Sequence, residues 1–308
     1  MRPFLKLIRW PNLVIVILTQ YLLYYRVLYP TFVDQQLTPT LDFFQLALLI
    51  FSTVCIAAAA YIINDIVDYD IDQINKSGKV IIHRFIPLAK ANNYYAILNG
   101  LGLVIGIYLS IQTNNFLLLL IYFPVIFMMW WYSKSLKKKP LSGNLIVALN
   151  CALVAIIVLL AERPALLELN AISSEEVRDI NFVFIAYAVF AFLSTLFREI
   201  VKDMEDIQGD KKGGANTLPI AIGLNKSKQV NYFTATLLIV SIGYWLISFA
   251  TQQPIWSNLF AVIGILLPIL YALFELQRAD TKDHFHCISQ IAKYIMLSGL
   301  IYLLVYRF

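Results

Sequence analysis

The sequence predicts an all-α fold, a polytopic membrane bundle of nine transmembrane helices. Two observations come from composition: hydrophobic residues make up 60% of the 308-residue chain and charged residues only 14%, against about 25% in soluble proteins. The third is a series of apolar runs of about 20 residues, each long enough to cross a hydrocarbon core of about 30 Å. These observations exclude a water-soluble globular protein and predict a single transmembrane domain over residues 1–308.

The nine predicted spans follow the apolar runs in order along the chain. The first comes after a short basic segment and lacks a small-residue cleavage signature, so it is expected to stay in the mature protein. The second and sixth end in clusters of acidic residues, and the fifth is followed by a long acidic loop at 162–180. The predicted spans are residues 13–30, 43–63, 94–112, 115–132, 143–161, 181–198, 230–250, 256–275 and 288–306.

Lysine and arginine are distributed unevenly between the two ends of these spans. The N-terminal segment and the loops after spans two, four, six and eight, together with Arg198 at the last position of the sixth span, carry 19 of them, whereas the other loops and the C-terminal end carry 3. Cytoplasmic segments of membrane proteins are enriched in both residues. The N-terminus and the even-numbered loops are therefore expected to face the cytoplasm of a bacterial or archaeal cell. Because the basic clusters lie between apolar runs, they indicate topology and no nucleic acid partner.

Two acidic clusters, at the ends of the second and sixth spans, share one spacing. Each has three aspartates at positions i, i+3 and i+7, which in a helix project within about 60° of one another. An even number of spans separates the clusters, so both should emerge on the cytoplasmic side. The aspartates are Asp65, Asp68 and Asp72 in the first cluster and Asp203, Asp206 and Asp210 in the second.

Carboxylates at this spacing repel one another unless a cation lies between them. Oxygen ligands suit Mg²⁺, which keeps several waters and is completed by the phosphate oxygens of a substrate. A different interpretation is that the aspartates only mark helix ends in solvated loops, but negative charge at a helix C-terminus opposes the helix dipole. The duplicated spacing therefore favours a Mg²⁺ site, with Asp68, Asp72, Asp206 and Asp210 as catalytic residues.

These clusters resemble the two aspartate-rich motifs of the UbiA superfamily of intramembrane prenyltransferases. The first motif reads Asn64-Asp65-x-x-Asp68-x-x-x-Asp72 and the second reads Asp206-x-x-x-Asp210. Further matching segments are Arg9-x-Pro11-Asn12 before the first span and Tyr132-Ser-Lys134-x-x-Lys137-x-x-Pro140-x-x-Gly143-Asn144 after the fourth. The resemblance implies that these aspartates and Asn64 hold Mg²⁺ on a prenyl diphosphate, and Asp203 extends the second motif by one helical turn.

Basic residues interleave with the acidic ones, as a diphosphate site requires. The expected diphosphate-binding residues are Lys79, Lys137, Arg198 and Lys202, and the expected acceptor-binding residues are Arg9, Asn12, Lys211 and Lys212. Arg26 and Lys293 lie inside spans, where snorkelling to the membrane surface explains them. The remaining basic residues near the motifs are interpreted as membrane anchors: Lys138, Lys139, Lys226 and Lys228.

The resemblance implies transfer of a prenyl group from a prenyl diphosphate to a lipophilic acceptor. The segment from Arg198 to Thr217 looks most like the digeranylgeranylglyceryl phosphate synthase branch, whose acceptor is the hydroxyl of geranylgeranylglyceryl phosphate. Alternatives are an aromatic acceptor such as 4-hydroxybenzoate or a naphthoate, and haem farnesylation. An ion-coupled transporter is a further alternative of a different class, although transporter sites usually lie near the membrane midplane. No obligate protein partner is evident.

Aromatic, cysteine and histidine residues complete the candidate list. Aromatic rings can stabilise an allylic cation in a dry cavity, and the candidates for such a wall are Tyr61, Tyr122, Tyr132 and Phe127. Cys55 and Cys151 lie inside apolar runs and are expected to be small buried hydrophobic residues. The histidines, His83, His284 and His286, show no metal-ligand spacing that includes a carboxylate, so no catalytic role is expected for them.

Overall fold

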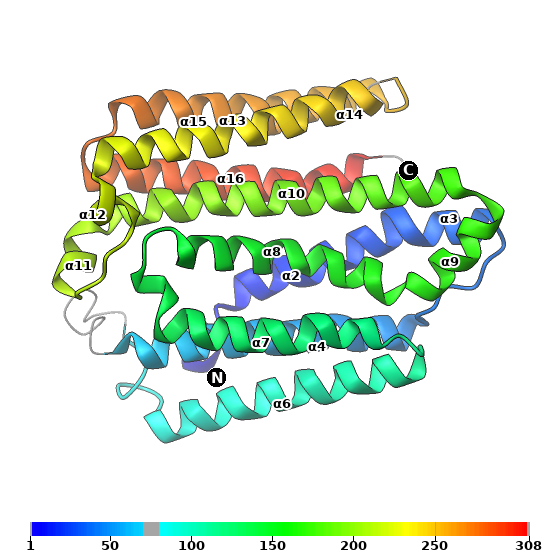
Figure 1. The fold of residues 1–308 in the computed structure, drawn as a ribbon, viewed down its shortest axis with the longest axis horizontal. Coiled ribbons are helices and arrows are strands. Elements are labelled where there is room, and N and C mark those ends of the chain that lie inside the picture. Colours follow the sequence, from blue (N-terminus) through cyan, green and yellow to red (C-terminus); the bar gives the residue numbers. More distant parts are fainter. Residues whose placement is uncertain (1, 70–79, 250, 307–308) are drawn as a thin grey trace. The chain divides into compact units, whose positions relative to one another are not determined.

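The structure, a computed structural model, describes residues 2–69, 80–249 and 251–306 (Figure 1). Within these residues, nine helical segments are long and apolar enough to cross a membrane, which confirms the predicted all-α class and the number of spans. The only β feature of the described residues is an isolated bridge between Ile82 and Ile86. The nine segments are Trp10–Asp34, Phe43–Val67, Leu88–Gln112, Phe116–Lys134, Ser142–Ala161, Ser174–Glu205, Leu224–Phe249, Ile255–Arg278 and Lys282–Val305.

Several helices extend beyond the apolar runs that predict them. The span expected at 94–112 begins at Leu88, and the span expected at 181–198 runs from Ser174 to Glu205. The added turns contain polar and charged residues, which can continue the backbone hydrogen bonds of a helix outside the hydrocarbon layer. Hydropathy therefore locates the membrane-embedded part of each helix, and the helix itself is longer.

Contacts between the described residues fall into two compact units, and each unit is considered by itself. The expectation of one domain over residues 1–308 stays a prediction. The first unit comprises Met1–Tyr24, Thr31–Ser135 and Ile157–Val177, and the second comprises Tyr25–Pro30, Leu136–Ile156 and Arg178–Phe308.

Helices α4, α6 and α7 of the first unit pack closely because small residues lie at their contacts (Figure 1). A Cβ atom added at Gly102 would lie 2.6 Å from Ile56 of α4, and one added at Gly106 would lie 2.6 Å from the ring of Tyr122 on α7. The Tyr122 hydroxyl forms a 2.6 Å hydrogen bond with Ser52. Tyr122 is therefore a packing residue of these three helices, although the sequence made it a candidate for a cavity wall. The elements of this unit are α1 (Arg2–Leu7), α2 (Trp10–Leu23), α3 (Tyr29–Asp34), α4 (Phe43–Val67), α6 (Leu88–Gln112), the 3₁₀ turn η2 (Phe116–Leu118), α7 (Leu119–Lys134) and α9 (Arg163–Ile172).

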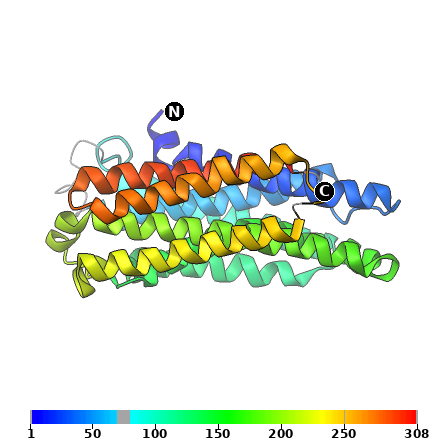
Figure 2. The same cartoon turned by 90° about the horizontal axis from the view of Figure 1, so that it is seen from above.

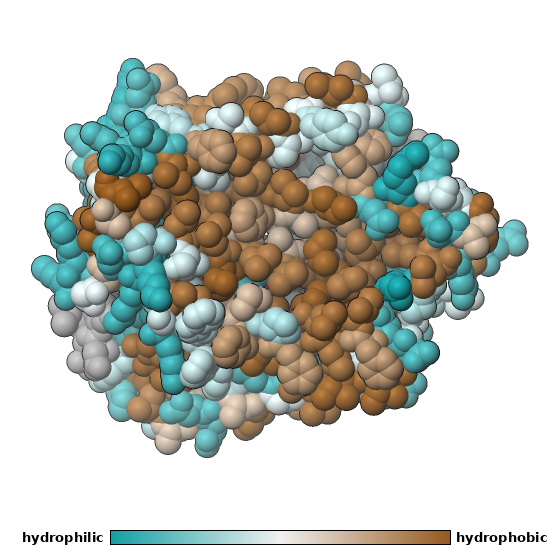
Figure 3. Space-filling view, in the orientation of Figure 1, coloured by the Kyte–Doolittle hydropathy of each residue, from teal (hydrophilic) through white to brown (hydrophobic). Residues whose placement is uncertain are grey.

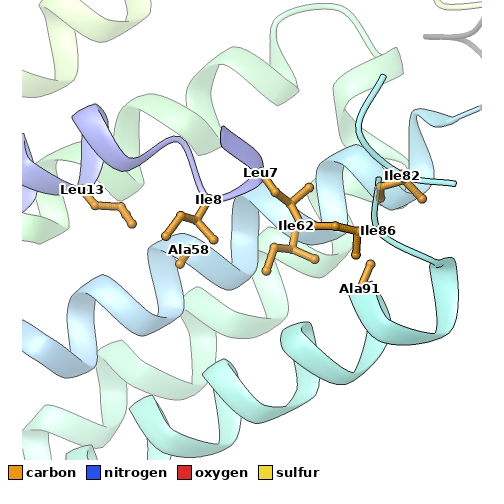
Figure 4. Close-up of a cluster of buried hydrophobic side chains, with 8 residues drawn as sticks. All are labelled: Leu7, Ile8, Leu13, Ala58, Ile62, Ile82, Ile86 and Ala91. Atoms are coloured by element: carbon orange, nitrogen blue, oxygen red, sulfur yellow. The ribbon is translucent and has the colours of Figure 1, made fainter. Parts of the chain in front are cut away.

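A buried hydrophobic cluster fixes the N-terminal segment against the end of α4 (Figure 4). Its central residue, Ile62, is fully buried and comes two positions before Asn64 of the first acidic motif. Burial of a side chain of this size contributes about 1.5–3 kcal/mol. The cluster therefore places the start of the chain beside the first motif. Its members are Leu7, Ile8, Leu13, Ala58, Ile62, Ile82, Ile86 and Ala91.

In the second unit, α15 and α16 lie side by side (Figure 2). Trp245 of α13 donates a 3.1 Å hydrogen bond to the hydroxyl of Tyr302 on α16. Gly299 lets α16 come close to Phe190 of α10, because any Cβ atom at this position would collide with the phenyl ring. The elements that lie wholly or mostly in this unit are the π-helical turn η1 (Tyr24–Leu28), the 3₁₀ turn η3 (Leu136–Lys138), α8 (Ser142–Ala161), α10 (Ser174–Glu205), α11 (Ile207–Lys212), α12 (Leu218–Ile222), α13 (Leu224–Phe249), α14 (Ile255–Ala261), the π-helical turn η4 (Val262–Leu266), α15 (Leu267–Arg278) and α16 (Lys282–Val305).

Arg26, in the π-helical turn η1, binds the end of the last helix. Its guanidinium donates to the carbonyl oxygens of Leu303, Leu304 and Tyr306, at 3.4, 3.3 and 3.0 Å. The last carbonyl groups of a helix have no partner within the helix, so these hydrogen bonds cap α16. The structure thus gives Arg26 a capping role in addition, and its expected snorkelling stays a prediction.

The exposed faces of the spanning helices are apolar, as a lipid environment requires. On α7, for example, Leu120, Phe123 and Phe127 are all exposed. Figure 3 shows the same pattern, with hydrophobic residues along the visible helices and hydrophilic residues at helix ends. Phe127 also contacts Trp130 on this outer face, so it does not behave as the cavity wall that the sequence suggested.

A buried carboxylate in the first unit forms hydrogen bonds between the segment before α4 and the connection from α8 to α9. Glu162, between α8 and α9, is fully buried and accepts hydrogen bonds from the backbone N–H groups of Thr40 and Leu41, at 2.7 and 3.0 Å. The Thr40 hydroxyl accepts a 3.0 Å hydrogen bond from the N–H of Ala165. Burial raises the pKa of Glu162 from 4.5 to about 7, although the hydrogen bonds from Thr40 and Leu41 oppose this shift.

The raised pKa of Glu162 predicts a stability that depends on pH. Because the folded protein holds this proton more tightly, its contribution is complete below pH 4.5 and is lost as pH rises through about 7. The shift corresponds to about 3 kcal/mol. In detergent, the melting temperature of the wild type should fall between pH 5 and pH 8, and that of Glu162→Gln should change less. Glu168→Gln, at an exposed position of α9, is the control and should follow the wild type; equal slopes for all three proteins would contradict the prediction.

Candidate functional site

The first acidic motif lies at the C-terminal end of α4. Asn64 and Asp65 are in its last turn, and Asp68 is the C-cap residue, whose N–H donates a 2.9 Å hydrogen bond to the carbonyl oxygen of Asn64. The helix therefore reaches Asp68, and Asp65 and Asp68 lie about one turn apart at its end. Asp72 and Lys79 lie outside the described residues.

The N-terminal segment brings its two predicted residues to this motif. Arg9 precedes α2 in a left-handed conformation, with φ of 50°, and its guanidinium lies 3.1 Å from a carboxylate oxygen of Asp65. The same guanidinium lies over the ring of Tyr61, 4.9 Å from its centroid, and Asn12 donates a 3.1 Å hydrogen bond to the Tyr61 hydroxyl. Tyr61 thus connects Arg9 and Asn12 to the motif.

The Arg9–Asp65 ion pair is partly exposed, with side-chain exposures of 44% and 21%. Ion pairs of this kind contribute about 0–1 kcal/mol, so a bound cation can replace Arg9 as the partner of Asp65. In Asn64, the residue directly before Asp65, the side-chain oxygen is buried and has no hydrogen-bond partner. A buried amide oxygen without a donor is costly for a protein and is a suitable ligand for a hard cation.

The second acidic motif begins at the end of α10 and continues into α11 (Figure 1). Asp203 accepts a 2.9 Å hydrogen bond from Asn144 of α8. Asp206 is the residue between the two helices, with φ of −103°, although its N–H and that of Asp210 still bond to the carbonyl four residues earlier. The motif therefore spans a bend, and the single helix face expected for its three aspartates ends at Glu205.

Asn144 ends the matching segment after the fourth predicted span, although no role of its own was predicted for it. It was visible as a polar residue just inside the fifth span, in the segment that follows Lys137. Its amide orients the carboxylate of Asp203, so it holds one of the predicted metal ligands in place.

Two of the predicted basic residues lie on α10 beside the second motif. Arg198 and Lys202 both bind the carboxylate of Glu199, at 2.8 and 2.9 Å. The Arg198 Nε atom is buried and has no hydrogen-bond partner. Each of these cations therefore keeps donor capacity that its protein partner does not use.

The other predicted basic residues lie in connections of the second unit. Lys137 is in the 3₁₀ turn η3, and Lys211 and Lys212 form the last turn of the short helix α11. A backbone hydrogen bond of 2.8 Å, from Asn216 to the carbonyl oxygen of Lys138, joins the segment after α11 to η3. This link brings the turn that carries Lys137 to the segment that follows the second motif.

The structure also places a histidine at the second motif. His286 of α16 lies 2.8 Å from the carboxylate of Glu205, and Gln290 and Lys293 continue a chain of hydrogen bonds along α16, at 3.2 Å each. The sequence analysis expected no catalytic role for His286 and examined Lys293 alone. The sequence did carry a signal for this contact, because these three polar residues recur at i, i+4 and i+7, which places them on one face of α16.

The residues of the two motifs fit a magnesium ion. Their side chains offer carboxylate and amide oxygens, which are the ligands that Mg²⁺ prefers, and basic residues lie next to both motifs. Among the described residues, no three acidic, histidine or cysteine side chains of one site are close enough to hold a metal alone. Mg²⁺ is normally completed by waters and substrate oxygens, so a partial set of protein ligands is sufficient.

Comparison with known proteins gives a consistent result. A family model described as the UbiA prenyltransferase family matches residues 13–297. The chain is 30% identical to digeranylgeranylglyceryl phosphate synthase from Methanosphaera stadtmanae, over 78% of this chain and 79% of that protein. It is 33% identical to the synthase of the same name from Sulfolobus acidocaldarius, over 68% of this chain and 67% of that protein.

Solved structures resemble this fold over nearly its whole length. One, from work on digeranylgeranylglyceryl phosphate synthase in membranes, superposes with a TM-score of 0.68 at 27% identity and covers 99% of this chain and 97% of its own. A UbiA homolog from Archaeoglobus fulgidus, bound to DMAPP and Mg²⁺, gives a TM-score of 0.59 at 16% identity, over 98% of this chain and 99% of its own. At that identity the second likeness shows the fold.

Proposed function

The chain belongs to the UbiA prenyltransferase family and is a membrane prenyltransferase, and we propose that its acceptor is the hydroxyl group of geranylgeranylglyceryl phosphate. The observation that carries the proposal is the identity of 30–33% with synthases of that name, over two thirds or more of both chains. The segment from Arg198 to Thr217, which looks most like the same branch, agrees with this proposal.

In this proposal the two acidic motifs hold Mg²⁺ on the diphosphate of the prenyl donor. The bound ion supplies charge neutralisation at the diphosphate as the bond to the prenyl carbon breaks. The oxygen of the acceptor hydroxyl would form the new bond to the prenyl carbon, the diphosphate would leave with the electron pair of the broken carbon–oxygen bond, and the hydroxyl proton would pass to the released diphosphate or to solvent. The proposed ligands are Asn64, Asp65, Asp68 and Asp72 of the first motif and Asp203, Asp206 and Asp210 of the second.

The neighbouring basic residues bind the charged parts of both substrates. Lys79, Lys137, Arg198 and Lys202 are proposed for the diphosphate because they flank the motifs, and two of them share Glu199 while retaining donors. Arg9 and Asn12 are proposed for the acceptor because they reach the first motif through Tyr61. The apolar membrane-spanning helices around the reaction site would exclude water, which would otherwise react with an allylic cation.

We further propose that the N-terminus and both motifs face the cytoplasm. The support is the unequal distribution of Lys and Arg, with 19 on one side of the predicted spans and 3 on the other. A cysteine introduced at Lys226, in a variant without native cysteines, should react with a membrane-impermeant reagent only after the cell is opened. If this cysteine is labelled in intact cells, the proposed orientation is contradicted and the opposite one is supported.

The substrate proposal is tested with purified protein, Mg²⁺ and geranylgeranyl diphosphate. The acceptor panel contains geranylgeranylglyceryl phosphate, 4-hydroxybenzoate, a naphthoate and haem, and the product is identified by its mass. We expect turnover of the glyceryl phosphate and no turnover of 4-hydroxybenzoate, which has no phosphate. Efficient prenylation of the aromatic acid alone would overturn the acceptor and leave the family reaction unchanged.

Neutralising Lys211 and Lys212 should weaken binding of the acceptor. Both side chains are exposed at the end of α11, next to the second motif, and an acceptor with its own phosphate needs positive charge beyond that which serves the diphosphate. We expect the double substitution to Gln to raise the KM for the phosphorylated acceptor about tenfold, or about 1.4 kcal/mol. The KM for the prenyl diphosphate should change far less.

The matched control for this prediction is the double variant Lys226→Gln, Lys228→Gln at the start of α13. These residues were interpreted as membrane anchors, so their replacement should leave both KM values close to those of the wild type. Equal effects of the two double variants would show that the change reflects net charge and not a site at α11.

A further inference from the structure

Two residues of α4 hold the side chain of Arg9. Its guanidinium forms a 3.1 Å ion pair with Asp65 and also lies over the ring of Tyr61, 4.9 Å from the ring centroid. Tyr61 and Asp65 are four positions apart on α4, so both contacts come from one face of the same helix end. Asn12 adds a further link between α2 and α4 through its 3.1 Å hydrogen bond to the Tyr61 hydroxyl.

The backbone of Arg9 is also fixed. It has a φ of 50° and a ψ of 53°, a left-handed conformation that residues other than glycine adopt rarely. Its N–H donates to the carbonyl oxygen of Lys6 at 3.1 Å, and its own carbonyl oxygen accepts from the N–H of Asn12 at 2.9 Å. Leu7 and Ile8, directly before it, belong to the buried cluster at the end of α4 (Figure 4). Such a conformation persists where the surroundings determine it, so the segment presents Arg9 to the first motif at a fixed place.

The ion pair joins two residues that have different proposed partners. Asp65 is a proposed ligand of Mg²⁺, and Arg9 is proposed to bind the acceptor. In the structure the two charges neutralise each other instead. A metal ion at Asp65 must therefore compete with the guanidinium, and an anionic acceptor at Arg9 must compete with the carboxylate. Both ligands have to break the same contact.

We propose that the Arg9–Asp65 ion pair couples the metal site to the acceptor site, a role that rests on the proposed prenyl transfer. When Asp65 binds Mg²⁺, its carboxylate no longer neutralises the guanidinium, and Tyr61 keeps Arg9 in place for the phosphate of the acceptor. The first ligand to bind breaks the ion pair, and the second binds without that cost. Because the coupling is reciprocal, each ligand should raise the affinity of the other by the same factor.

The exposure of the ion pair limits the size of this coupling. The side chains of Arg9 and Asp65 are 44% and 21% exposed, so solvent screens their attraction. We expect a coupling of about two- to fivefold, and fivefold corresponds to about 1 kcal/mol, the upper value for an ion pair of this kind.

The first experiment measures acceptor binding without metal. The Kd of geranylgeranylglyceryl phosphate is determined by titration calorimetry on the full-length protein in detergent with a chelator. Asp65→Asn releases Arg9, so it should bind this acceptor about two- to fivefold more tightly than the wild type. Asp68→Asn is the matched control, because it removes an equal charge about one turn away and leaves the ion pair in place. Its Kd should change much less.

The second experiment measures metal binding without substrate. Mn²⁺ accepts the same oxygen ligands as Mg²⁺, and its binding can be followed by electron paramagnetic resonance. Arg9→Gln removes the competitor at Asp65, so it should lower the Kd of Mn²⁺ about two- to fivefold. Lys6→Gln, at an exposed position of α1, removes an equal charge from the same segment and should have a much smaller effect.

The third experiment measures the coupling itself. The Kd of the acceptor is compared with and without saturating Mn²⁺ in the wild type, Asp65→Asn and Arg9→Gln. The ratio of the two Kd values should be about two- to fivefold larger in the wild type than in either variant, because both variants lack the ion pair. The two substitutions break the pair from opposite sides, so a variant that fails to fold leaves the other to decide.

A permanent structural contact would give a different result. If Asp65→Asn binds the acceptor no more tightly than Asp68→Asn, and Arg9→Gln binds Mn²⁺ no more tightly than Lys6→Gln, the coupling role is overturned. Failure of the proposed function is distinguishable from this. A wild type that binds no glyceryl phosphate, but whose Mn²⁺ affinity rises on Arg9→Gln, would lose the acceptor assignment and retain the competition at Asp65. The coupling would then be measured with 4-hydroxybenzoate, which is also an anion.

Discussion

The variants Asp68→Ala and Asp206→Ala should each lose prenyl transfer almost completely, by about a thousandfold or more. Each removes one carboxylate from a different acidic motif, at the C-cap of α4 or at the bend between α10 and α11. In the proposed mechanism neither motif can be replaced by the other, because Mg²⁺ and the diphosphate need ligands from both. The measurement is the rate of product formation by purified protein at saturating substrate and Mg²⁺.

These two substitutions should have little effect on folding. Both aspartates are only partly buried, and they are expected to bind metal rather than to support the helix packing. Melting temperatures in detergent should therefore stay near that of the wild type. Asp280→Ala, at an exposed carboxylate before α16, is the control and should retain full activity. Near-normal turnover by both Asp68→Ala and Asp206→Ala would remove the metal-site interpretation.

Removal of Mg²⁺ should abolish activity, and addition of Mg²⁺ should restore it. The reason is the charge of the site: carboxylates and a diphosphate in one place repel one another without a divalent cation between them. The measurement is product formation after exhaustive chelation and again after Mg²⁺ is added back.

A second readout separates metal binding from catalysis. Mg²⁺ together with inorganic pyrophosphate should raise the melting temperature of the wild type, because a ligand that binds only the folded state stabilises it. The same additions should have a much smaller effect on Asp206→Ala. Activity that survives chelation, or equal stabilisation of both proteins, would contradict the prediction.

The number and class of the helices could be predicted from the sequence, because a bilayer imposes long apolar runs that need no tertiary information. The ends of the helices could not. Ser174–Glu205 begins with a charged turn that hydropathy excludes, and the break at Asp206 depends on local backbone geometry. The spacing of the second motif alone was compatible with a continuous helix.

The candidate site was predicted unevenly, for a similar reason. Aspartates with a repeated spacing can be recognised from the sequence alone. So can Arg9 and Asn12, because they lie in a segment that matches a known motif. The contact between Glu205 and His286 joins residues separated by 81 positions, so it depends on how α16 lies along α10. The same holds for Asn144 and Asp203, 59 positions apart. Pairs like these depend on packing, which a single sequence does not specify.

The cap that Arg26 provides to α16 has a consequence for biosynthesis. Its carbonyl partners begin 277 residues later in the chain, at Leu303. At a synthesis rate of about 5–20 residues per second, the ribosome needs tens of seconds to make that segment. During this interval the first span carries a guanidinium without these partners, and an ionised group within a span is costly until it is paired. The first helix to be made therefore gains its full stability only when the last one is complete, and a truncated chain would leave this arginine exposed to the quality control of the cell.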